Sequence, residues 1–309
     1  MPDLNRPERE LETVIHHVVL SDAVAIVSAL VTALANGIAV TTQHLASTST
    51  KNHERGWQFL RYLMHHPLWL LGWGALAGSL LFQAVALHFA SMSLVQPLLV
   101  VELVLALVLR RTWLRQMVSW RAWASSGATV FFLGTFLFAT TRSGRSSISS
   151  LHWWAPGIWS AGLVTLLVAV GTRGSPRRRA AMWGSATAVL WALEAAFIKQ
   201  CTNVISQVGY FHLLSRWPFY AFIVCGVAGL VCEQTALHVG PLKFSQTAIV
   251  IVDPVASVLL GIWIFADRLG RGWIWPSVAV MSLVLALVSA AILIAAMPQN
   301  MQESVIVPR

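Results

Sequence analysis

Residues 230–259 read LVCEQTALHVGPLKFSQTAIVIVDPVASVL, two apolar runs joined by a short turn. Residues 80–109 read LLFQAVALHFASMSLVQPLLVVELVLALVL, and a constant shift of 150 residues aligns the two stretches without a gap. Nine of the 30 positions are then identical, among them a histidine pair and a glutamine pair, His88/His238 and Gln96/Gln246. Leucine and valine match by chance in apolar sequence, so the polar pairs carry the comparison and predict an internal repeat.

The chain is richer in hydrophobic residues and poorer in charged residues than a soluble protein. Of its 309 residues, 57% are hydrophobic and 11% are charged, whereas a soluble domain has about 25% charged residues. The net charge of +9 does not indicate nucleic-acid binding, because the basic run at 173–180 lies between apolar segments, where an anchor against anionic lipid is expected. The three cysteines form no CxxC pair, so neither a disulfide framework nor a zinc site is predicted. We therefore expect a membrane protein in contact with the lipid bilayer, without a cofactor.

Nine stretches are long and apolar enough to cross a bilayer, which takes about 20 residues. They are 20–42, 68–89, 92–109, 124–141, 153–171, 180–201, 216–239, 243–265 and 272–296. The first is not followed by a signal-cleavage pattern and is expected to remain as a span. Two shorter amphipathic stretches, 57–66 and 206–216, are expected to lie along the membrane surface.

The loops predict the orientation, because lysine and arginine accumulate on the cytoplasmic side. The side that holds the C-terminus carries 13 of these residues, and the side that holds the N-terminus carries 7. We therefore predict a protein of the plasma (cytoplasmic) membrane with its N-terminus outside and its C-terminus inside.

The two similar stretches form spans two plus three and spans seven plus eight. Corresponding spans are five apart, an odd number, so the copies cross the membrane in opposite directions. The predicted fold is an all-α membrane protein with an inverted repeat of four helices, a linking helix and four more, a construction common in secondary transporters. The segments are an extracytoplasmic N-terminal segment, a first repeat, a link with a basic loop, a second repeat and a cytoplasmic tail, at 1–19, 20–141, 142–179, 180–296 and 297–309.

Two segments carry a resemblance to a known family. ALHFASMSLVQPLLVVELVLALVLRR (86–111) and ALHVGPLKFSQTAIVIVDPVASVLLGIWIFADRL (236–269) each have an AL pair, a short hairpin and a helix that runs to a charged end. This layout resembles the drug/metabolite transporter superfamily, with its EamA and NIPA branches. SLVQPL (93–98) is similar to the TLVTPLG stretch of NIPA-type magnesium transporters, although Leu99 replaces the glycine, and the ten-span EamA form would need a further helix. The resemblance implies a transporter fold and transfers no substrate.

Two acidic residues lie deep in these repeated spans. At about 1.5 Å per residue, Glu102 and Asp253 each lie roughly 15 Å along their spans, near the midplane. Such a residue costs about 2.5–3.5 kcal/mol to insert, so it usually faces a pathway, a partner or water. We predict that both line a substrate or ion pathway.

Prolines accompany both acids. Pro254 has no amide hydrogen and is predicted to break the helix and release the carbonyl of Val250 beside Asp253. Pro97 is predicted to release the carbonyl of Ser93 in the same way.

Further polar side chains in the spans complete the predicted pathway. They are Glu194, Glu233, Gln96 and Gln246, with Trp191 beside Glu194 as a lining residue. Lys199 follows Glu194 on the same span and is expected to extend to the outer surface. Asn36 is expected to join helices by hydrogen bonding, and Gly74 and Gly78 have the spacing of a close helix contact.

Tryptophans are expected to form an aromatic belt near the span ends, with Trp153 and Trp217 among them. Trp73 and Trp263 lie deeper, and are expected to line a pocket or to fill the core.

Three functions fit this pattern. The first is a proton-coupled secondary transporter that exports a small cationic or lipid-linked metabolite or drug. The second is a NIPA-type magnesium transporter, in which Glu102 and Asp253 contact a hydrated ion. The third is a non-transporting membrane scaffold. An enzyme is not expected, because no catalytic motif occurs and the soluble segments are short. The sequence is also compatible with a homodimer.

Overall fold

The computed structural model describes residues 6–48, 67–113, 117–140, 153–267, 269, 272 and 274–296. Within these ranges the elements are ten α-helices and one 3-10 helix, and no strand occurs. They are α1 (Arg6–Thr48), α3 (Pro67–Phe89), α4 (Met92–Leu99), α5 (Val101–Trp113), α6 (Trp120–Thr140), α7 (Trp154–Gly171), α8 (Pro176–Val208), η2 (Tyr210–Ser215), α9 (Trp217–Val239), α10 (Leu242–Phe265) and α11 (Ile274–Ala296).

The described residues contain nine segments long and apolar enough to span a membrane, with α4 and most of α5 forming one of them. Eight agree with the predicted spans to within four residues at both ends. The sixth is longer than predicted because α8 continues to Val208. For the described residues, the prediction of an all-α protein with about nine candidate membrane spans is therefore confirmed.

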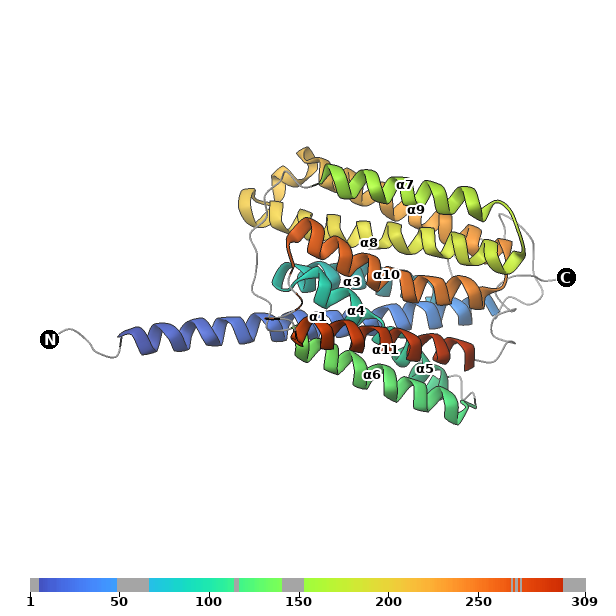
Figure 1. Cartoon of the computed structure of the whole chain (residues 1–309), viewed down its shortest axis with the longest axis horizontal. Coiled ribbons are helices and arrows are strands. Elements are labelled where there is room, and N and C mark those ends of the chain that lie inside the picture. The colour runs from blue at the N-terminus through green and yellow to red at the C-terminus, as the bar shows by residue number, and fades with distance from the viewer. Residues whose placement is uncertain are drawn as a thin grey trace.

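Helix α1 is much longer than a span. Its 43 residues extend about 65 Å, roughly twice the 30 Å thickness of the hydrocarbon core. Residues 6–19, predicted as part of a separate N-terminal segment, continue this helix, and its first turns project beyond the bundle (Figure 1).

Local sequence explains several helix ends. Ser175 caps α8 by accepting a hydrogen bond from the amide of Arg178, and Pro176 occupies the first turn, where no amide partner is lost. Helix α10 ends at Phe265. The next residue, Ala266, adopts a left-handed conformation with φ 51°, and the amide of Asp267 donates to the carbonyl of Gly261 at 3.1 Å.

Small residues allow close helix contacts. Ala25, Ala29 and Ala33 recur every four residues along α1 and are fully buried. On the same helix the Thr32 hydroxyl donates to the carbonyl of Ser79 in α3 at 3.3 Å. Helix α1 therefore packs along α3, as α8 packs along α9.

The other extensive contacts join α8 to α10 and α6 to α11. Figure 1 shows α7, α8 and α9 along one side of the bundle, with α6 and α11 along the opposite side. Helices α3, α8 and α10 finish at the end from which α1 projects, and α5 and α9 finish at the other end.

Three sequence predictions about packing are wrong, the second of them in part. A Cβ added at Gly74 or Gly78 meets no atom of the described residues within 4 Å, so these glycines make no close contact with the helices that the structure describes. Trp73 and Trp263 are about half exposed and do not fill the core, while the alternative, that they line a pocket, stays a prediction. Trp153 is buried and stacks on Phe197, with ring centroids 5.1 Å apart, although it was assigned to the aromatic belt.

The two predicted surface stretches have different outcomes. Residues 57–66 lie outside the described residues. Residues 206–216 contain η2, which has no buried residue, and the side chain of Phe211 is 95% exposed.

Candidate functional site

Glu102 lies in the first turn of α5, directly after an interruption of the helix. Helix α4 ends at Leu99, and the amide of Val100 donates to the carbonyl of Pro97 at 3.2 Å, a 3-10 hydrogen bond. The interruption thus follows Pro97 by three residues. A helix N-terminus favours a carboxylate, and the Asn36 side-chain amide of α1 donates to Oε2 of Glu102 at 3.0 Å.

Asp253 lies in the middle of α10 and is partly buried. The Ser257 hydroxyl, one turn further along the helix, donates to Oδ1 of Asp253 at 3.3 Å. Helix α10 is continuous through Pro254, so the predicted helix break at this proline is wrong. The neighbouring turns keep their helical geometry, and Pro254 removes only the amide that the carbonyl of Val250 would accept.

Glu194 and Trp191 lie on the face of α8 that meets α9. A Cβ at Gly226 of α9 would lie 2.9 Å from Oε1 of Glu194, and one at Gly229 would lie 2.8 Å from the indole ring of Trp191. Two glycines of α9 therefore make room for these two side chains. Trp191 packs against a helix, while Glu194 extends its carboxylate over the backbone of a neighbour.

Three pairwise electrostatic interactions link four of the predicted acids. The Asp253 carboxylate lies within electrostatic range of Glu102 and Glu194, and Glu102 lies within range of Glu233 on α9. Their helices are α5, α8, α9 and α10, so residues distant in sequence supply one group of charges. We call Glu102, Glu194, Glu233 and Asp253 the acid cluster.

The two predicted glutamines differ in their surroundings. Gln96 on α4 is 3% exposed, and its Nε2 has no hydrogen-bond partner among the described residues. Gln246 on α10 is partly buried. The two residues occupy corresponding positions of the predicted repeat, and of the two only Gln96 has a buried donor without a partner among the described residues.

Several residues of this region could not be identified as site residues from the sequence. Ser257 and Gly226 carry no pattern of their own, and Asn36 was assigned only to helix joining. Lys199 was predicted to extend to the outer surface, but its Nζ donates to the carbonyl of Ala90 at 2.7 Å in the turn between α3 and α4. These partners are 66 to 109 residues apart for the contacts of Asn36 and Lys199, so only the fold reveals them.

Among the described residues, no three His, Cys, Asp or Glu side chains lie close enough together to hold a metal ion. The predicted pair for magnesium, Glu102 and Asp253, is brought within electrostatic range. A cation between them would keep water in its coordination shell, as magnesium usually does.

Comparisons with known proteins identify a relative of similar length. An uncharacterized protein of Corynebacterium glutamicum is 23% identical over 286 residues, which cover 88% of this chain and 95% of the relative. The similarity therefore extends over most of the chain. No protein-family model matches the chain, and no solved structure matches it.

Proposed function

We propose that this protein is a secondary transporter of the drug/metabolite transporter type, which exports a small organic cation in exchange for protons by alternating access. The acid cluster carries the proposal, because three pairwise electrostatic interactions link four carboxylates from four helices. Ionised carboxylates repel strongly in a medium of low dielectric constant. Charge balance therefore requires bound protons or a bound cation, and an exchanger alternates between the two.

The arrangement of the helices supports an inverted repeat. Under the shift of 150 residues, α3 corresponds to α9 and α4 with α5 corresponds to α10, and we pair α1 with α8 and α6 with α11. The close pairing of α1 with α3 then corresponds to that of α8 with α9. Such repeats allow two halves to move around a central site.

The surroundings of Glu194 support an organic substrate. Trp191 lies one turn before Glu194 on α8 and is partly buried. An aromatic face near a carboxylate is a combination that binds organic ammonium ions. In the orientation that we propose, the N-terminus is outside, the C-terminus is inside, and export proceeds across the plasma membrane.

The test is transport in proteoliposomes that contain a pH-sensitive dye and a magnesium-sensitive dye. A panel of organic cations is added to the wild-type protein and to the variants Asp253→Asn and Glu102→Gln. Asp22→Asn is the matched control, since it removes a carboxylate from the first span outside the acid cluster. We expect cation-dependent proton movement in the wild type and in the control, and its loss in both cluster variants.

Other outcomes identify the competing functions. Magnesium flux that depends on Glu102 and Asp253, without proton movement, would assign the protein to magnesium transport. Absence of every flux across the panel would contradict transport and favour the scaffold.

A further inference from the structure

Two charged side chains of the second half hold the turn between α3 and α4. Nζ of Lys199 in α8 donates to the carbonyl of Ala90 at 2.7 Å. Oδ2 of Asp267, which follows α10, accepts from both the amide and the hydroxyl of Ser93, each at 3.0 Å. Hydrogen bonds to ionised groups are stronger than those between neutral groups. We call these contacts of Lys199 and Asp267 with the turn the latch.

The chain conformation at the end of α10 directs the Asp267 side chain toward α4. Ala266 adopts φ 51°, a left-handed conformation that is unfavourable for any residue with a Cβ. The chain turns back there, and Asp267 reaches the free amide of Ser93 in the first turn of α4. Gly261 allows this approach, because a Cβ there would lie 2.5 Å from the Ser93 hydroxyl and 2.6 Å from Oδ2 of Asp267.

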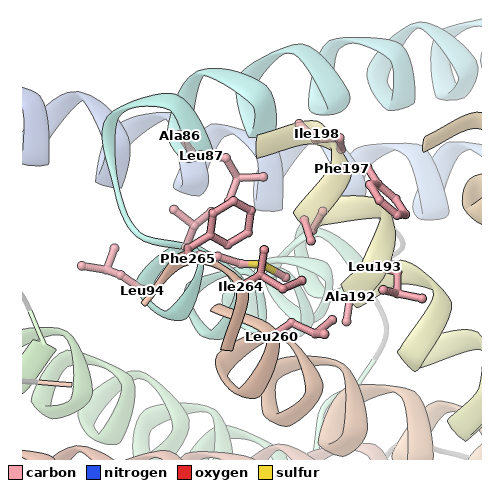
Figure 2. Packing of buried hydrophobic residues seen from close by; sticks show 14 of the residues in the cluster. Ala86, Leu87, Leu94, Ala192, Leu193, Phe197, Ile198, Leu260, Ile264 and Phe265 are labelled. Atoms are coloured by element: carbon pink, nitrogen blue, oxygen red, sulfur yellow. The ribbon is translucent and has the colours of Figure 1, made fainter. Parts of the chain in front are cut away.

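Buried apolar side chains close the bundle next to the latch. Figure 2 shows them converging from α3, α4, α8 and α10, and we call them the hydrophobic plug: Ala86, Leu87, Leu94, Ala192, Leu193, Phe197, Ile198, Leu260, Ile264 and Phe265. The ring of Phe265 joins plug to latch, because Nζ of Lys199 lies 5.2 Å from its centroid. Trp153 packs on the rings of both Phe197 and Phe265.

The opposite end of the bundle lacks an equivalent bridge in the described residues. The shift of 150 places Gly240 opposite Ala90 and Met117 opposite Asp267. Gly240 packs against Pro176 of its own half, and Met117 is 84% exposed. Helix α3 also packs against α8, whereas their counterparts α9 and α1 make at most slight contact among the described residues.

We infer that the latch and the plug form a gate that is shut in this structure, and that the turn between α3 and α4 moves away from α8 and α10 when the gate opens. Opening breaks three hydrogen bonds to charged groups and exposes the plug to water. The inference rests on the proposed function for its role in transport, but the movement itself can be measured without a substrate.

The experiment measures the labelling of a cysteine in the plug by a water-soluble maleimide in detergent solution. The background carries alanine at the native cysteines Cys201, Cys225 and Cys232, and the reporter is Leu260→Cys. Lys199→Met and Asp267→Asn remove the charges of the latch while nearly conserving side-chain size. We expect Lys199→Met, which loses one charge-assisted hydrogen bond, to raise the labelling rate about tenfold, and Asp267→Asn, which weakens two, to raise it at least as much. Lys199→Arg, which keeps a donor, should restore slow labelling.

Controls separate opening of the gate from general loosening. Lys243→Met makes the same chemical change at the opposite end and should leave labelling of the Leu260→Cys reporter unchanged. A second reporter at that end, Gln246→Cys, should not become more reactive in the latch variants. Equal increases at both reporters, or no increase at the Leu260→Cys reporter in either latch variant, would overturn the gate.

The outcomes also keep the two proposals apart. If the protein transports a cation but the latch variants do not change the labelling rate of the Leu260→Cys reporter, the gate is contradicted and the proposed transport function stands. If the latch variants raise the labelling rate but the protein transports no cation, the gate movement is supported and the proposed transport function is contradicted.

Discussion

Glu102 receives two stabilising contacts that act on its charged form. It lies at the N-terminus of α5, and it accepts a hydrogen bond from Asn36 of α1. The second contact also fixes the distance between the two helices at this depth. Asn36 is thus a positioning residue for one member of the acid cluster.

Replacing Asn36 tests this role. Asn36→Ala should lower the free energy of unfolding by about 0.6 kcal/mol, and by no more than about 1.7, the range for hydrogen bonds between membrane helices. Asn36→Asp should be more destabilising, because it places a second carboxylate against Glu102. The measurement is unfolding in detergent. If Asn36→Ala and Asn36→Asp were equally stable, the Asn36–Glu102 contact would not exist in solution.

Residue spacing alone predicts that Glu102 and Asp253 lie near the middle of their spans, because the rise per residue of a helix is constant, and their depth in the membrane stays a prediction. Their partners could not be predicted. Asn36 precedes Glu102 by 66 residues, and Ser93 precedes Asp267 by 174. A single sequence carries no signal for pairs that only the packing of helices brings together.

The Glu194 carboxylate can occupy its position only because residue 226 is a glycine, with no side chain. Gly226→Ala should destabilise the protein by about 1–3 kcal/mol, the usual cost of overpacking. In the double variant with Glu194→Ala the added cost should largely vanish, since the new Cβ then meets no carboxylate. Gly162→Ala is the control, because a Cβ there meets no atom within 4 Å. The measurement is the free energy of unfolding. If the losses of the two single variants simply add in the double variant, the Glu194 carboxylate does not lie against Gly226.

At the scale of elements, apolar runs predicted the spans well because both their length and their composition are set by the bilayer. The apolar runs did not predict where a helix continues past the end of the apolar run, as α1 and α8 do. Nothing in an apolar count marks residues 6–19 as helical, and the continuation of α8 to Val208 is equally polar in character. Pro254 shows the converse error, since a proline in a helix does not always interrupt it.

Exposed apolar side chains of η2 predict that this element lies at the membrane surface. Tyr210, Phe211 and Leu214 are mostly exposed, and Trp217 and Tyr220 follow at the start of α9. Aromatic residues gather at the interface between lipid and water. A nitroxide at Phe211→Cys should therefore be reached both by oxygen dissolved in lipid and by a water-soluble nickel complex. Access to the nickel complex alone, as expected for a label at Met117→Cys in a loop, would place η2 in water.

At the scale of the whole molecule, the two ends of the bundle differ in chemistry as well as in closure. The end with the latch carries the projecting turns of α1 and the aromatic contacts of Trp153. The other end carries the start of α8, where three consecutive arginines follow Pro176. Since arginine and lysine accumulate on the cytoplasmic side, the gate that is shut in this structure would be the outer one.

This orientation can be measured directly. In a background without native cysteines, Glu8→Cys on the projecting part of α1 should react with an impermeant maleimide added to intact cells. Thr172→Cys, between α7 and α8, should react only after the cells are opened, because it lies beside the basic end. The reverse pattern would invert the orientation and make the latch a cytoplasmic gate, so that the same contacts would control entry of an exported cation instead of its release.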